Sequence, residues 1–293
     1  MLLTMTDLQN QIILVTGATS GIGEVTARTL AQRGAHVVLL ARNAAKAEAT
    51  RAAIQAAAGH DRVDVLLADL ADLDQVRRVA AEFNDRYPRL DILVNNAGLL
   101  PAKERKVTPQ GYETGLATNY LGPFLLTALL FDKLRESPAA RIINVSSAGY
   151  RFATPDLNNL QQEQGYSQMY MYSNTKLYNI MFTQELARRM RAHGIQNVTT
   201  NALHPGAVAS SFAGDGDSWL GIAMRLGRPF MISSEQGAAT SIFLAADPSV
   251  AQISGGYYVK QKPKAVKHSF NTLENARKLW QRTEELTGAQ LLD

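Results

Sequence analysis

A tyrosine and a lysine four residues apart, Tyr172 and Lys176, are the side chains in this sequence best suited to proton transfer. Residues at this spacing on a helix lie on one face, a single turn apart. A free tyrosine, with a pKa of about 10, is a poor base at neutral pH, but a neighbouring ammonium favours the tyrosinate. A pair of this kind can act as an acid–base centre, although a tyrosine and a lysine at this spacing are common in helices. Tyr166, Tyr170 and Tyr178 have no lysine four residues later and are expected to serve in loops, pocket or packing.

A glycine-rich turn, TGATSGIG at residues 16–23, lies between a short apolar run and a helical pattern. Glycines there allow a tight turn, close approach of a pyrophosphate and close packing of helix on sheet. The start of the following helix adds N–H groups and partial positive charge. An ordinary glycine-rich connection is the alternative, but the strand–turn–helix–strand order favours dinucleotide binding. The expected contacts are Gly17, Thr19, Ser20, Gly21, Ile22 and Gly23.

The residues after the second apolar run, Ala41-Arg42-Asn43, indicate which dinucleotide is bound. NAD-binding folds usually place an acid there to accept from the adenosine ribose. No carboxylate is present to repel a 2′-phosphate, and Arg42 can pair with one. A solvated surface arginine is the alternative. The sequence favours NADP(H), with Ser20 as a second phosphate contact.

The elements that must position these residues alternate between short apolar runs and helical patterns. Continuous Val, Ile and Leu runs suit strands buried on both faces of a parallel sheet. We therefore expect a single α/β domain over residues 1–293, a doubly wound (Rossmann) sheet with helices on both faces. The expected strands are 12–15, 37–40, 63–67, 92–94, 141–145, 198–203 and 257–259. The expected helices are 25–33, 44–58, 73–87, 112–135 (adjusted at Gly122-Pro123), 169–193, 235–246 and 272–285.

Composition excludes several other classes. The 293 residues carry a formal charge of only +4, which does not predict nucleic-acid binding. The absence of cysteine excludes disulfides, thiolate catalysis and cysteine-based metal sites, and no metal is expected. Residues 1–10 do not resemble a signal peptide, and the most apolar run, 121–131, is too short to span a bilayer. We expect a cytoplasmic protein.

Four motifs together resemble the short-chain dehydrogenase/reductase family over nearly the whole chain. They are the glycine spacing of residues 16–23, Asn95-Asn96-Ala97-Gly98, the Tyr172–Lys176 pair and Pro205-Gly206. The resemblance implies a small alcohol or carbonyl substrate and an NADP(H) cofactor. It also implies cofactor contacts beyond the turn, at Asp69, Leu70, Asn95, Ala97, Gly98, Tyr172, Lys176, Pro205, Gly206, Val208 and Ser210. Ser210 stands where the family has Thr, which weakens that one assignment.

The same resemblance assigns two further catalytic residues. In the family the second serine of a pair such as Ser146-Ser147 bonds the substrate oxygen, which selects Ser147. Asn119 matches the asparagine that holds a water in a proton relay through Lys176. An asparagine is otherwise unfavourable within a helix, which supports a specific role. The catalytic set is thus Asn119, Ser147, Tyr172 and Lys176.

Further features are similar to the retinol dehydrogenase-like branch, namely His204 before Pro205-Gly206, Leu279-Trp280 in the tail and the long segment between Ser147 and Tyr172. Thr175 departs from the serine usual in that branch, and we expect no N-terminal anchor of the kind that many animal members carry. Residues 212–232 could form a lid over a lipophilic substrate or a plain amphipathic surface helix. Residues 262–293 form a helical extension that could block one interface, so monomer and homodimer both remain open.

Two alternatives carry different functions. The first is a catalytically silent dinucleotide-binding or redox-sensing protein, which would have no chemical reason to retain all four catalytic residues. The second is a sugar-nucleotide epimerase or dehydratase, which also uses a Tyr–Lys pair but shows a different glycine spacing. Light-driven pigment reductases are similar as well, but their activity is associated with a cysteine that this chain lacks.

Overall fold

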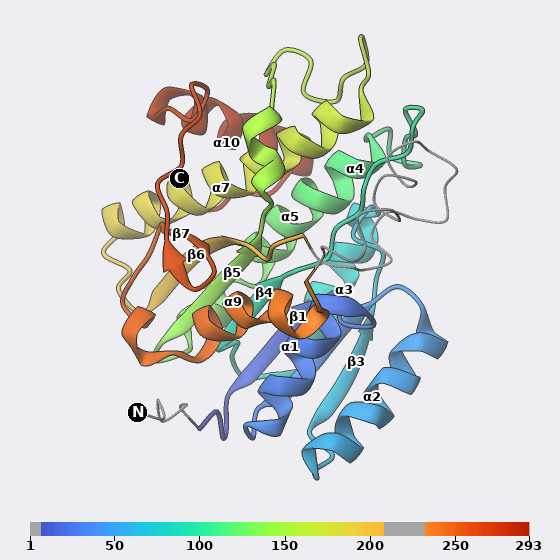
Figure 1. Ribbon diagram of the computed structural model, residues 1–293, viewed down its shortest axis with the longest axis vertical. Coiled ribbons are helices and arrows are strands. Elements are labelled where there is room, and N and C mark those ends of the chain that lie inside the picture. Colours follow the sequence, from blue (N-terminus) through green and yellow to red (C-terminus); the bar gives the residue numbers. More distant parts are fainter. Residues whose placement is uncertain (1–6, 208–231, 293) are drawn as a thin grey trace.

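The computed structural model describes residues 7–207 and 232–292, and within them the chain forms one sheet of eight strands (Figure 1). The strand order is β3-β2-β1-β4-β5-β6-β7-β8, and all neighbours are parallel except β7 and β8. This arrangement confirms the predicted doubly wound α/β fold. The strands are β1 (Ile12–Thr16), β2 (His36–Ala41), β3 (Val63–Leu67), β4 (Ile92–Asn95), β5 (Ala140–Val145), β6 (Val198–His204), β7 (Tyr257–Val259) and β8 (Lys262–Pro263).

Helices cover both faces of the sheet. Alternate residues of each strand point to opposite faces, so Ile13 and Val15 join one apolar cluster and Leu14 joins the other. The first cluster includes residues of α1, α2 and α9, and the second includes residues of α3, α5, α7 and α10. The helices are α1 (Gly21–Gln32), α2 (Ala44–Ala58), α3 (Leu73–Arg86), α4 (Thr114–Leu116), α5 (Gly122–Leu129), α6 (Phe131–Arg135), α7 (Gln168–Ala192), α9 (Ser234–Ala246) and α10 (Leu273–Thr287). Short turns η1 (π, Ala117–Leu121), η2 (3-10, Ala148–Phe152) and η5 (3-10, Pro248–Val250) complete the described elements.

The prediction of one long helix over residues 112–135 was wrong. That stretch is divided into α4, the π-helical turn η1, α5 and α6. Pro123 explains part of the irregularity, because proline has no N–H to donate to the carbonyl four residues earlier. That carbonyl belongs to Asn119, and it accepts instead from Asn179 Nδ2 of α7 at 3.1 Å. This hydrogen bond, made where the helix is interrupted, therefore links the stretch to α7.

The C-terminal extension packs on α7 beside the same stretch (Figure 1). Trp280 of α10 is buried, and its ring stacks on Phe182 of α7 at 5.7 Å between centroids. Tyr120 Oη and Thr283 Oγ1 lie 2.9 Å apart and share a hydrogen bond. Within the described ranges 7–207 and 232–292, no helix is long and apolar enough to cross a membrane.

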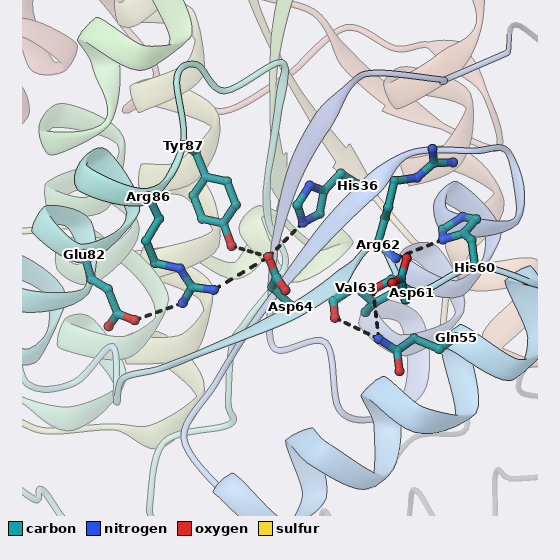
Figure 2. A network of polar contacts seen from close by, with 10 residues as sticks. All are labelled: His36, Gln55, His60, Asp61, Arg62, Val63, Asp64, Glu82, Arg86 and Tyr87. Atoms are coloured by element: carbon teal, nitrogen blue, oxygen red, sulfur yellow. Dashed lines mark hydrogen bonds and ion pairs between the residues drawn. The ribbon is translucent and has the colours of Figure 1, made fainter.

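A polar network joins β2, β3 and the end of α3 (Figure 2). The Asp64 carboxylate accepts from Tyr87 Oη at 2.6 Å and lies 2.8 Å from His36 Nε2 and 3.7 Å from Arg86 Nη2. Burial raises the pKa of Asp64, but the hydrogen bonds from Tyr87 and His36, with the charges of His36 and Arg86, outweigh it and hold that pKa below its ordinary value. His36 and Asp64 lie at or near the amino ends of β2 and β3. The network therefore stabilises the fold at that edge and lies away from the carboxyl ends of the strands.

Candidate active site

Strand order reverses between β1 and β4, and open α/β sheets bind ligands outside the carboxyl ends of their strands at such a point. A cavity of about 720 Å³ lies there. Its lining includes most of the predicted residues: Gly17, Thr19, Ser20, Gly21, Ile22, Gly23, Arg42, Asp69, Leu70, Ala97, Gly98, Ser147, Tyr172, Lys176, Pro205 and Gly206. Asn95 and Asn119 do not line it. Val208, Ser210 and nearly all of the predicted lid at 212–232 lie outside the described residues.

The glycine turn has the geometry that a phosphate cradle requires. Gly17 adopts φ +64°, in the left-handed region that favours glycine. A side chain at Gly23 would place its Cβ only 2.3 Å from the Gly17 carbonyl oxygen. The Ser20 side chain at the N-cap makes no capping hydrogen bond to α1. The first-turn N–H groups of α1 are therefore left for another acceptor, and an anion fits there.

Asn95, the last residue of β4, was predicted to contact the cofactor, but the next residue, Asn96, is the one that reaches the cavity. Asn95 Nδ2 donates to Thr127 Oγ1 at 3.1 Å and to Asn144 Oδ1 at 2.9 Å, so this side chain lies inside the fold, away from the cavity. Asn96 lines the cavity instead, and its Nδ2 donates to the Thr16 carbonyl at 2.9 Å. The motif indicated the right segment, but the alternation of side chains at a strand end decides which asparagine reaches the cavity.

Arg42 follows β2 at one end of the cavity. Its side chain is exposed and makes no ion pair within the described part of the chain. The next residue, Asn43, caps α2 by accepting from Lys46 N at 2.9 Å. Asp69 is the only carboxylate among the described lining residues, and its Oδ1 accepts from Ala71 N at 2.9 Å. The guanidinium is thus available to an anionic ligand.

Ser147, Tyr172 and Lys176 are brought together near the carboxyl end of β5. Tyr172 and Ser147 lie close together, since a Cβ built on Gly149 would be 3.3 Å from Tyr172 Cε1 and 3.4 Å from Ser147 Oγ. Lys176 Nζ lies 5.7 Å from the centre of the Tyr172 ring. Lys176 Nζ donates to the Val145 carbonyl at 3.0 Å. Ser146 Oγ donates to the Lys176 carbonyl at 2.6 Å. Ser146 therefore anchors α7, and Ser147 is the serine whose hydroxyl meets the tyrosine.

Burial controls the proton affinities of this group. Burial raises the pKa of Tyr172, and the hydrogen bond with Ser147 offsets only part of that rise. Burial also lowers the pKa of Lys176 to about 8. The expectation that Lys176 lowers the pKa of Tyr172 is not met, because desolvation of the phenolate dominates. Tyr172 is therefore a neutral phenol at pH 7.

Asn119 connects the loop after β4 to α7. Its Oδ1 accepts from Leu99 N at 2.8 Å, and its Nδ2 donates to the Leu99 carbonyl at 2.9 Å and to Thr175 Oγ1 at 3.3 Å. A Cβ built on Gly98 would lie 3.3 Å from Asn119 Oδ1 and 3.4 Å from Lys176 Nζ, so both atoms approach the same point. The amide is fully engaged with protein groups, and its assignment to a water relay stays a prediction.

Several lining residues were missed from the sequence. They are Leu40, Ala41, Ala68, Asn96, Leu99, Leu100, Thr118, Val145, Ser146, Ala148, Met169, His204 and Ala207. Most of them directly flank a predicted residue, so position next to a strand end was the available signal. Leu99, Leu100 and Met169 give one part of the wall an apolar surface. Within the described residues, no group of three or more acidic or histidine side chains could hold a metal ion.

Comparison with known proteins decides the family. The family model for short chain dehydrogenase matches residues 11–220. This chain belongs to the short-chain dehydrogenase family. Human retinol dehydrogenase 12 is 37% identical over 285 residues, covering 97% of this chain and 89% of that protein. Mouse retinol dehydrogenase 11 is 38% identical, covering 96% of this chain and 87% of that protein. The short-chain dehydrogenase therefore belongs to the retinol dehydrogenase-like branch and is an oxidoreductase of that family.

Solved structures agree with this assignment. A structure from Mycobacterium paratuberculosis matches the short-chain dehydrogenase with a TM-score of 0.77 and 30% identity, covering 98% of this chain and 97% of the other. A short chain dehydrogenase from Escherichia coli, solved with NADPH, gives a TM-score of 0.68 at 25% identity and covers 87% of this chain and 99% of its own. The shared fold thus extends to a protein with NADPH bound.

Proposed function

We propose that this short-chain dehydrogenase interconverts an alcohol and an aldehyde or ketone with NADP(H), acting on lipophilic substrates, with Tyr172 as the general acid and base. One observation carries the proposal. A single cavity is lined by the glycine turn and Arg42, at the ends of β1 and β2, and by Ser147, Tyr172 and Lys176, near the end of β5, which lies further along the sheet. A dinucleotide held by the turn would bring its far end to the proton-transfer group.

The residues present fit NADP(H). The open N-terminus of α1 suits the pyrophosphate, and the exposed guanidinium of Arg42 suits the 2′-phosphate. The relative from Escherichia coli solved with NADPH supports this choice. When bound, the cofactor supplies or accepts the hydride. Tyr172 and Lys176 would bind its far end, and Gly206 lies at the same end of the lining.

The protein side chains would supply the proton that carbonyl reduction consumes. In carbonyl reduction, negative charge develops on the substrate oxygen, and a neutral phenol is the form that can give up a proton. Ser147 and Tyr172, whose side chains both lie beside Gly149, would both donate to that oxygen. Lys176, held against the Val145 carbonyl, would place a cation beside the tyrosinate that results. The raised pKa keeps Tyr172 protonated at pH 7, which is the form that carbonyl reduction requires at its start.

The wall of the cavity supports a lipophilic substrate. Leu99, Leu100 and Met169 line it, and apolar walls with a few polar groups are typical of small-molecule sites. The retinol dehydrogenase relatives are named for a lipophilic alcohol. The catalytically silent alternative is disfavoured because Ser147, Tyr172 and Lys176 are assembled in the arrangement that proton transfer requires.

The test is the loss of reduced-nicotinamide absorbance with NADPH, and separately with NADH, over lipophilic aldehydes and ketones that include retinal. We expect turnover that prefers NADPH. Binding of NADPH without turnover of any carbonyl would support the silent-binder alternative. Failure to bind either nucleotide would refute the proposal at its first step.

A further inference from the structure

His204, at the carboxyl end of β6, lines the cavity without a part in the mechanism above. Even-numbered residues of β6 face α7: Ala202 joins the cluster that contains α7, and Leu203 joins the opposite one. Alternation along the strand places the His204 ring on the α7 face as well. The neighbouring position of β5 is Ser146, whose N–H donates to the Leu203 carbonyl at 2.8 Å and whose hydroxyl bonds to α7. His204 therefore lies beside the Ser147 and Tyr172 group.

The two ring nitrogens of His204 have different surroundings. Nδ1 is buried and has no hydrogen-bond partner among the described residues. Nε2 also lacks a partner there, but it is not buried, so it is the nitrogen open to the cavity. A buried N–H without an acceptor is costly. The favoured neutral tautomer therefore carries its proton on Nε2, directed at whatever occupies the cavity.

The charge state of the ring agrees with this geometry. Burial and, to a smaller extent, the charge of Arg151 together lower the pKa of His204 to about 4. The ring is then a neutral imidazole at pH 7, which can present one donor and one acceptor but no full charge. Ser147 and Tyr172 already serve the reacting oxygen. A third donor on this wall has no role toward that oxygen and is free to contact another atom of the substrate.

We infer that His204 is a specificity-determining residue whose Nε2–H donates to a second acceptor oxygen of the substrate, near the reacting carbonyl. The inference rests on the proposed function and narrows its substrate class. The favoured substrates are lipophilic carbonyl compounds with a neighbouring oxygen, such as dicarbonyls and keto esters. An apolar side chain at this position would leave that second oxygen desolvated and unpaired.

The first experiment compares kcat/KM for 2,3-hexanedione and 2-hexanone in the wild type, His204→Leu and His204→Gln. Intrinsic reactivity differs between the two ketones, but it cancels when their ratio is compared across enzymes. We expect His204→Leu to lower the ratio by about three- to tenfold, the effect of one neutral hydrogen bond. Glutamine keeps a donor and should recover part of the loss. An unchanged ratio in His204→Leu would overturn the inference.

The second experiment needs no turnover and so separates this inference from the proposed function. Two-bond ¹H–¹⁵N correlation spectra report histidine tautomers, and loss of one signal in His204→Gln assigns it among the five histidines. We expect a neutral ring protonated on Nε2 at pH 7. A ring protonated on Nδ1, or an imidazolium, would overturn the inference even in an active enzyme. Absence of turnover with the expected tautomer would instead count against the proposed function.

Discussion

Replacing Arg42 with glutamine should weaken NADPH binding and leave NADH binding nearly unchanged. A charge-assisted hydrogen bond contributes about 1.5–3 kcal/mol. Arg42 is exposed, so water and salt screen part of that attraction, and we expect about 1–2 kcal/mol. Because 1.4 kcal/mol is a tenfold change in affinity, the Kd for NADPH should rise by about 5- to 30-fold.

The assay is calorimetric titration of each nucleotide into the wild type and Arg42→Gln. Arg78→Gln is the matched control, because Arg78 is an exposed arginine on α3 that does not line the cavity. The loss for NADPH should shrink at higher salt, as expected for an exposed charge pair. Equal weakening of NADPH and NADH, or no weakening of either, would refute Arg42 as the reader of the 2′-phosphate.

Other perturbations separate fold from chemistry. Ser146→Ala should cost about 1–2 kcal/mol in urea unfolding, since it removes a buried bond to Lys176. Ser147→Ala should keep its stability but lower kcat by roughly 100-fold, as for loss of one oxyanion donor. Trp280→Ala should cost about 3–5 kcal/mol of unfolding free energy by emptying a buried site. Asp64→Asn should cost about 1 kcal/mol at pH 7. Because the folded pKa of Asp64 is lowered, its contribution is present above the ordinary aspartate pKa and disappears as pH falls through the folded value, so variant and wild type should converge in acid.

The sequence predicted seven of the eight described strands, because strands such as β1, β2 and β4 are short apolar runs that are almost wholly buried. Strand β8 was missed, because it is two exposed residues without such a pattern. Helix α2 was predicted with its observed bounds, since its alanine-rich sequence needs no tertiary contact to favour a helix. The stretch 112–135 failed for a tertiary reason. The Asn119 carbonyl freed by Pro123 finds its partner in Asn179, some sixty residues later. No local pattern reveals that pairing.

In the site, too, locally determined features were predictable from the sequence and features that depend on tertiary structure were not. Residues fixed by backbone geometry, such as Gly17 and Gly23, were predictable from spacing alone. Residues whose direction depends on strand alternation were not, as the exchange of Asn95 for Asn96 shows. The pKa of Tyr172 was misjudged in direction because spacing shows the nearby lysine but not the burial of the phenol.

The central claim is that Tyr172 transfers the proton, and Tyr172→Phe tests it most directly. The variant keeps the aromatic ring and its packing and lacks only the phenolic hydroxyl. Single-turnover reduction of a lipophilic aldehyde should slow by about a hundred- to ten-thousand-fold, while NADPH should still bind. Turnover by Tyr172→Phe within a few-fold of wild type would contradict the account.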